Sequence, residues 1–140
     1  MRGRPNDFEA PTTTWTLQGE WQIETPQGIG SGDPSRAYNN TKALGHDLTG
    51  LGANPGNYEP NLANLAARTP TFNATAWRST KLLLYRNLSV EPNDDAQLWV
   101  FTPQGLPVYR SEGTFVSDNG YIAQSFDLTG AVDGKAAVYF

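Results

Sequence analysis

No window of about eleven residues in this chain carries apolar side chains at the spacing of a convincing helical stripe. The apolar runs are short, contain β-branched and aromatic residues, and are bounded by Gly, Pro, Asn or Asp. Runs of this kind are typical of β-strands that are joined by turns. The 14 glycines and 10 prolines among 140 residues supply many turn positions. The sequence therefore predicts an all-β protein.

The strongest strand candidate is 79–90, where Leu82 and Leu84 lie on one side and Leu83 and Tyr85 on the other. About seven to nine strands are expected, with turn signals near the spacing of about 8–12 residues that β-sandwiches show. Because no helices intervene, we expect antiparallel pairing. The other candidates lie at 14–19, 20–25, 37–46, 96–105, 107–112, 121–129 and 135–140.

Two local features qualify this pattern. The first two strand candidates flank Gly19, so they form either a hairpin or one strand that bends there. A short helical turn is expected near 61–67, because Leu62 and Leu65 lie three residues apart and Pro70 ends the run.

The length suits a single domain. We predict one module over 1–140, folded as an antiparallel, jelly-roll-like β-sandwich, with 1–6 as an N-terminal extension. The segment 45–61, rich in Gly, Asn and Pro, is expected to be a surface loop, and loops of that length in compact domains are often functional.

The charge excludes several classes of partner. Charged residues make up 17% of the chain and its net charge is −4, whereas a nucleic-acid-binding protein needs a basic face. The ten Lys and Arg residues are scattered, and no apolar run approaches the ~20 residues of a membrane span. The chain has no cysteine, so disulfides and thiolate metal sites are excluded.

Three stretches carry motifs in an order that suggests a family. The first is "DFEAPTTTWTLQGEWQIETPQGIGSGDPSRAYNNTKALGHDLTG", the second is "LLLYRNLSVEPNDDAQLWVFTPQG", and the third is "SFDLTGAVDGKAAVYF". Together they resemble the opening, the central strand pair and the ending of MAM-like and galactose-binding-like jelly-roll modules of bacterial secreted proteins. The resemblance covers roughly residues 7–140. It implies a non-catalytic β-sandwich, often stabilised by Ca²⁺, that accompanies extracellular peptidases, glycan-degrading enzymes or adhesins.

One departure from that family concerns the C-terminus. Members usually continue into a Trp-x-Ile-Asp-Asp-Val strand that closes a sheet, whereas this sequence stops at Phe140 within an apolar strand. Either the chain is a fragment, or another chain supplies the strand, so that the protein self-associates by strand addition at the C-terminal edge. The N-terminal residues lack the apolar middle of a signal peptide, which suits an intracellular protein or a module of a longer secreted chain. We expect the second, with an extracellular or cell-surface location.

The resemblance also implies a calcium site. Ca²⁺ takes six to eight oxygen ligands, and the acids at the family-matching positions are Glu9 and Asp33. Asn40 is the third expected ligand, and Asp7 and Asn39 could add oxygens. The alternative is that Asp33 begins a turn with the proline after it, and that Glu9 is a solvated charge at a strand end. Zinc is excluded because the chain has one histidine and no cysteine.

A second acidic group lies in the connection between two strong strands. Glu91 and Asp95, with Asp94 between them, either form a second cation site or belong to a polar hairpin loop, and turn chemistry favours the loop. His46, the only histidine, lacks a Gly-x-Ser-x-Gly elbow, so we expect it to be a surface residue rather than a catalytic one. Carboxylate pairs of the kind glycosidases use could be drawn from Glu20, Glu24, Glu59, Glu91, Asp95 and Glu112, but no spacing selects a pair.

Glycan binding would use exposed aromatic rings beside polar groups. We expect most of the aromatic residues to be structural, and we name Tyr58, in the long loop, and Trp77 as glycan-binding candidates. The pool from which they come is Trp15, Trp21, Trp77, Trp99, Tyr38 and Tyr58.

These observations predict a non-catalytic extracellular module for adhesion, binding or self-assembly, stabilised by calcium. Its expected partners are a glycan or a further copy of the chain, with no nucleic acid and no membrane span. Two alternatives remain open: an accessory structural domain of a secreted peptidase or glycan-degrading enzyme, and a carbohydrate-binding module.

Overall fold

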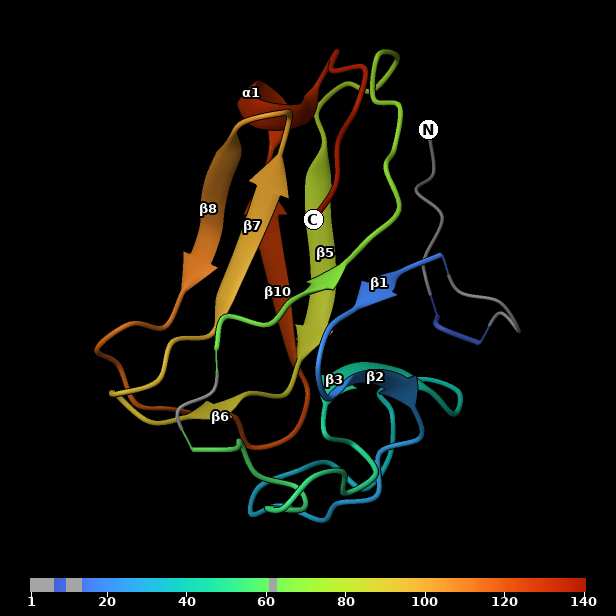
Figure 1. Ribbon diagram of the computed structural model, residues 1–140. Helices are drawn as coiled ribbons and strands as arrows, with labels where there is room; N and C mark the ends of the chain where they lie inside the picture. Colours follow the sequence, from blue (N-terminus) through green and yellow to red (C-terminus); the bar gives the residue numbers. More distant parts are fainter. Residues whose placement is uncertain (1–6, 10–13, 61–62) are drawn as a thin grey trace. The chain divides into compact units, whose positions relative to one another are not determined.

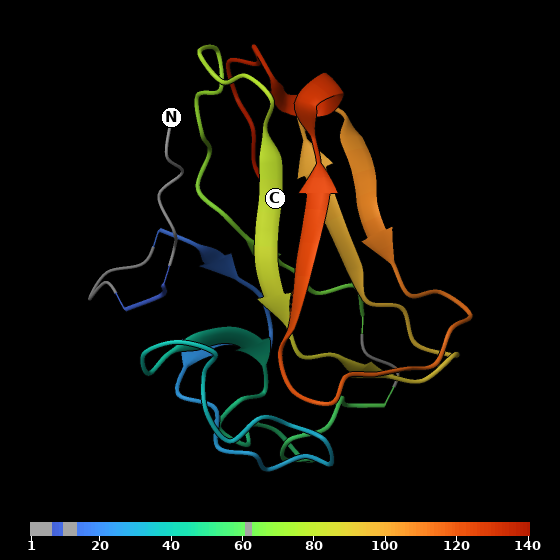
Figure 2. The same cartoon turned by 180° about the vertical axis from the view of Figure 1, so that it is seen from behind.

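The structure is a computed structural model that describes residues 7–9, 14–60 and 63–140 (Figures 1 and 2). Its contacts divide the chain into two compact units, Met1–Ala67 and Arg68–Phe140. The described residues form strands, antiparallel ladders and one short helix, which confirms the all-β prediction. A single module over 1–140 and a closed jelly-roll sandwich stay predictions, and 1–6 lies outside the described residues.

The first unit is built around one antiparallel ladder. Strand β2 pairs with β3, so that Trp21 lies opposite His46 and the buried Ile23 lies opposite Leu44. The chain bends at Gly19, which has φ 57°, a conformation that glycine adopts without steric cost. The strands are β1 (Thr16–Leu17), β2 (Trp21–Glu24) and β3 (Ala43–His46), and β4 (Ala67–Arg68) spans the boundary between the units. Of the two alternatives expected at Gly19, the hairpin is therefore wrong, because β1 and β2 do not pair with each other, and the chain instead bends there.

The helical turn expected near 61–67 is also wrong for its described part, 63–67, which contains no helix. The backbone there pairs with a distant segment of the same unit. The Gln18 N–H donates to the Ala66 carbonyl at 3.0 Å, and the Ala66 N–H donates to the Gln18 side chain at 3.0 Å. The Leu65 carbonyl accepts the Trp21 indole N–H at 3.1 Å. These long-range bonds use the groups that a helix would pair internally.

The second unit contains most of the strands. Its main ladders are β7 with β8 and β5 with β10, and a short ladder joins β6 to β9. The helix α1 has four residues, and no helix in the described ranges is long and apolar enough to cross a membrane. The elements are β5 (Lys81–Arg86), β6 (Ser89–Val90), β7 (Gln97–Phe101), β8 (Gly105–Arg110), β9 (Val116–Ser117), β10 (Ile122–Asp127) and α1 (Thr129–Val132).

One hydrophobic core lies between the two main ladders of this unit. In both views β7 and β8 lie on one side and β5 and β10 on the other (Figures 1 and 2). Each ladder contributes side chains to the core, which confirms that apolar alternation in these strands directs one face inward. The buried residues are Ala74, Val100, Leu128, Val132 and Val138, and Trp77, Leu82, Val108, Phe126, Ala131 and Phe140 pack against them.

The C-terminal segment is paired within its own unit. Val138 bridges Phe72, and Tyr139 bridges Phe101. The Phe140 N–H donates to the Thr69 hydroxyl at 3.0 Å, and the Phe140 carbonyl accepts the Thr69 N–H at 2.9 Å. Strand addition at this edge would have to replace these bonds, so self-association there stays a prediction without support from the geometry.

Candidate functional site

The outer face of β7 carries a row of stacked aromatic rings. Val100 is fully buried, so strand alternation directs Trp99 and Phe101 to the opposite face. The ring centroids of Trp99 and Phe101 lie 6.2 Å apart, and those of Phe101 and Tyr139 lie 4.8 Å apart. Gly105 lies opposite Phe101 in β8, and a Cβ there would come within 2.7 Å of that ring. The missing side chain therefore gives the rings their room, and we call Trp99, Phe101 and Tyr139 the aromatic row.

Polar groups lie at both ends of the aromatic row. At one end the Arg68 guanidinium lies 3.6 Å from the centre of the Tyr139 ring, a cation–π contact. At the other end the Trp99 indole N–H donates to the side-chain oxygen of Gln97 at 2.6 Å. The three rings are half-buried, so part of each remains accessible to a ligand.

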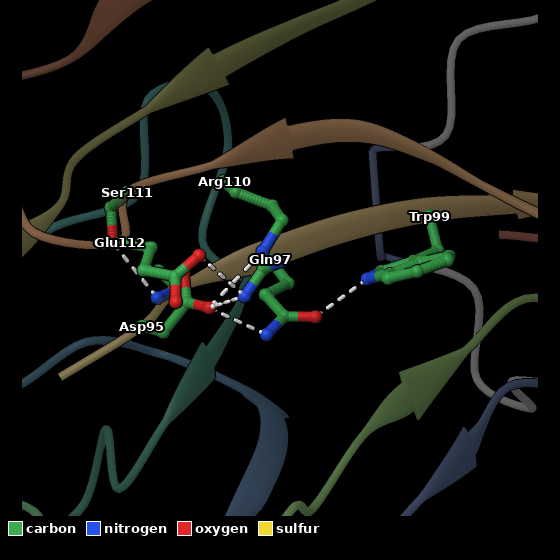
Figure 3. Close-up of polar contacts among 7 residues, drawn as sticks. Asp95, Gln97, Trp99, Arg110, Ser111 and Glu112 are labelled. Atoms are coloured by element: carbon green, nitrogen blue, oxygen red, sulfur yellow. Dashed lines mark hydrogen bonds and ion pairs between the residues drawn. The ribbon is translucent and has the colours of Figure 1, made fainter.

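A charged cluster continues from Gln97 across the ladder (Figure 3). The register places Gln97 opposite Arg110, whose Nη2 lies 2.6 Å from Asp95 and 2.9 Å from Glu112. The Gln97 amide also donates to Asp95 at 2.7 Å. Figure 3 shows the resulting line of contacts from Glu112 through Arg110, Asp95 and Gln97 to the Trp99 ring. We call Asp95, Gln97, Arg110 and Glu112 the polar cluster.

The electrostatics of the polar cluster keep Asp95 and Arg110 ionised. The hydrogen bond from Arg110, helped by one from Gln97, lowers the pKa of Asp95 below its ordinary value. The same bond raises the pKa of Arg110. Side-chain exposure is 41% for Arg110 and 68% for Glu112, so both charges also face solvent. The cluster can therefore offer both hydrogen-bond donors and hydrogen-bond acceptors to a bound polar molecule.

These contacts also bear on the acidic connection before β7. Asp95 is paired with Arg110, and the Asp94 N–H donates to the Glu91 carbonyl at 3.0 Å, which closes a turn. The connection is therefore a polar turn, as turn chemistry favoured, but it is not a hairpin loop, because β6 pairs with β9 and β7 pairs with β8. A second cation site at Glu91 and Asp95 stays a prediction.

The expected calcium ligands are engaged by hydrogen-bond donors. Glu9 accepts the Thr41 hydroxyl at 2.5 Å and the backbone N–H groups of Thr41 and Lys42, and these bonds, led by that of the hydroxyl, lower its pKa. Asp33 instead accepts the Gly30 N–H at 2.9 Å, within the turn closed by its own N–H. Asn40 donates from its amide to Asp7 at 3.3 Å. Oxygens that already face N–H and O–H donors fit a cation poorly.

Across residues 7–9, 14–60 and 63–140, no three His, Cys, Asp or Glu side chains form a group that could hold a metal ion. One pair of carboxylates does come together in the first unit. Oε1 of Glu20 and Oε1 of Glu59 both approach the place where a Cβ on Gly52 would lie. Oε2 of Glu20 is buried without a hydrogen-bond partner, whereas Glu59 accepts the N–H groups of Ala53 and Asn54. The bonds from Asn54 are the main reason that the pKa of Glu59 is lowered.

The sequence placed both glutamates among possible carboxylate pairs but could not select them, because only the folded loop brings 20 and 59 together. His46 ends β3, but it is half-buried rather than at the surface, and its Nε2 is buried without a partner, so the expected surface position is wrong. Its ring packs between those of Trp21, at 5.8 Å, and Tyr58, at 5.0 Å.

The two glycan candidates differ in their surroundings. Tyr58 is 45% exposed and stays a candidate. Trp77 packs against the core of the second unit and lies 6.0 Å from the Phe72 ring, which assigns it a structural role. Trp99 was only one member of the aromatic pool in the sequence, because Tyr139 and Arg68, which extend the row beyond Phe101, come from distant segments of the chain.

Comparison with known proteins identified no relative of this chain. No protein-family model, curated protein or solved structure matches the chain. The resemblance to MAM-like and galactose-binding-like modules therefore stays a prediction, and a function has to be argued from the geometry of the site.

Proposed function

We propose that the chain is a non-catalytic carbohydrate-binding module, and that the aromatic row and the polar cluster form its binding face. The single observation that carries the proposal is the continuous line from the stacked rings of Trp99 and Phe101 to the charged groups of Asp95 and Arg110. We keep the extracellular location and the adhesive role as parts of the same proposal.

The chemistry of a sugar matches this combination. A pyranose ring has an apolar C–H face, which packs on an aromatic ring, and a rim of hydroxyls, which exchange hydrogen bonds with carboxylate, amide and guanidinium groups. Binding sites generally pair an apolar surface with a few placed polar groups of this type. The polar cluster holds Gln97 and Arg110 in place through their bonds to Asp95, so little side-chain freedom is lost on binding.

The test is binding to a glycan array, followed by affinity measurements on the best oligosaccharide. Replacing Trp99 with alanine should weaken binding about tenfold, because losing one stacked ring costs about 1.5 kcal/mol. Tyr85→Ala is the matched control, since Tyr85 is 51% exposed on the other ladder and should leave the affinity unchanged. An array without signals, or equal losses in both variants, would contradict the proposal.

Calcium is a second candidate, favoured by the buried, unpartnered Oε2 of Glu20 beside Glu59. Oε2 of Glu20 would supply one ligand, and carbonyl and water oxygens would have to complete the coordination of Ca²⁺, because Glu59 already accepts the N–H groups of Ala53 and Asn54. We expect calcium to raise the melting temperature, since a ligand at 100 times its Kd stabilises a protein by about 2.7 kcal/mol. Glu20→Gln should abolish that rise, whereas Glu24→Gln, at an exposed position of the same segment, should keep it. A melting temperature indifferent to calcium and to a chelator would refute the calcium site.

A further inference from the structure

An open groove lies between β8 and β10 in the second unit. Its volume is about 330 Å³. The floor belongs to the core, because Leu128 is 5% exposed and Val108 and Phe126 pack against the core residues. Leu106 forms part of the rim and is 49% exposed. The residues that line the groove are Leu106, Pro107, Val108, Ser125, Phe126, Asp127 and Leu128.

Both strands beside the groove are sheet edges. Strand β8 pairs only with β7, and β10 pairs only with β5, among the strands of the described ranges. In a strand with one partner, alternate residues direct their N–H and C=O groups away from that partner, so these groups have no strand to pair with. The groove therefore presents backbone hydrogen-bonding groups as well as apolar side chains.

The two edges differ in how well they are protected. In β8, Pro107 has no N–H, so this residue cannot donate a backbone hydrogen bond to an added strand. A register shift between Leu98 and Trp99 also distorts that ladder. Strand β10 has no proline and no register shift, and its one charged residue, Asp127, is at its end. Of the two edges, only β10 is open to a further strand.

The charge of the groove indicates which side chains an added strand would carry. Asp127 is the one charged residue among those that line the groove. Its carboxylate accepts the hydroxyl of Thr129 at 2.6 Å and the N–H of Thr129 at 3.0 Å. These bonds, together with the charge of Lys81, which lies opposite Asp127 in β5, lower the pKa of Asp127, so the carboxylate is anionic at neutral pH. An occupant with a basic residue at this end of the groove would complement it.

We propose that the groove binds an extended peptide that pairs with the open edge of β10, places an apolar side chain over Phe126 and Leu128, and sets a Lys or Arg beside Asp127. Addition of a strand to an exposed sheet edge is a general mode of peptide recognition, in which backbone bonds give affinity and side-chain pockets give specificity. The proposal concerns a different face from the aromatic row and does not rest on carbohydrate binding.

The probe is a displayed library of hexapeptides with Val, Leu or Phe at alternate positions, panned against the whole chain. Enriched peptides should share a basic residue next to the alternating apolar positions. For the best peptide, Leu106→Asp should lower affinity at least tenfold, because it places a second carboxylate at the apolar rim. Phe115→Asp is the control, since Phe115 is 64% exposed in the same unit and does not line the groove.

Backbone methylation of the peptide separates strand pairing from simple apolar adhesion. Methyl groups on the amides that face β10 should abolish binding, whereas methyl groups on the alternate amides should leave it unchanged. Enrichment of no peptide, equal effects of the two methylation patterns, or retention of full affinity by Leu106→Asp would each overturn the proposal.

Discussion

Replacing Asp118 with alanine is expected to lower the free energy of unfolding of the second unit by about 3 kcal/mol. The Asp118 side chain is 5% exposed and binds the Arg86 guanidinium through both oxygens, at 2.8 and 3.0 Å. It also accepts the Leu88 N–H at 2.9 Å. The alanine variant would deprive a largely buried guanidinium of its carboxylate, although its contact with the Tyr109 ring would remain, and would leave the Leu88 N–H without its acceptor. Urea unfolding, followed by tryptophan fluorescence, measures the change.

Asp95 supplies the control for this prediction. It also pairs with an arginine, Arg110, but that pair is more exposed to solvent, and exposed ion pairs contribute little. Asp95→Ala should therefore shift the unfolding midpoint much less than Asp118→Ala. Equal shifts would show that the burial of the Arg86–Asp118 pair does not determine its contribution.

Replacing Asp47 with alanine is expected to destabilise the first unit by about 3 kcal/mol, because two partly buried N–H groups would lose their acceptor. Asp47 is 1% exposed, and its two carboxylate oxygens accept the N–H groups of Leu51 and Gly56. Its backbone has φ 49°, which Asp and Asn tolerate better than alanine does. The Asp47 side chain thus fixes the conformation of residues 47–56, within the stretch 45–61 that the sequence predicts only as an irregular surface loop.

Hydrogen exchange at Leu51 and Gly56 checks this prediction. Both amides should exchange much faster in Asp47→Ala than in the wild-type chain. Asp47→Asn, which keeps one acceptor and the tolerance for positive φ, should lose less stability than the alanine variant. Wild-type exchange rates at both amides in Asp47→Ala would contradict the proposed role of the carboxylate.

The sequence was sufficient to predict the strands that show a clear alternation of apolar and polar side chains along their own length. Strands β5, β7, β8 and β10 all lie within expected ranges or overlap them, because side-chain alternation records which face is buried. The short helix was expected in the wrong place. Bonds from Gln18 and Trp21 hold the backbone near 65 in an irregular conformation, and α1 forms instead directly after β10. Strand β9, with two residues, is too short for any periodic signal.

The candidate site was less accessible from the sequence, because it depends on pairing between strands. The position of Gln97 opposite Arg110 follows from the register of β7 with β8, and a register cannot be read from either strand alone. The same holds for Glu20 and Glu59, which meet only beside Gly52 in the folded loop. Asp33 was expected to be a calcium ligand or a turn residue, and its bond to Gly30 supports the turn.

The central claim is that a carbohydrate binds at the outer face of β7, and the indole signals of the tryptophans test it most directly. A ¹⁵N-labelled chain titrated with the best oligosaccharide should show a shift of the Trp99 indole N–H, which donates to Gln97 of the polar cluster. The indole signals of Trp21, bound to the Leu65 carbonyl, and of Trp77, packed on the core, should stay in place. Saturable binding that shifts Trp21 and leaves Trp99 unmoved would contradict the account.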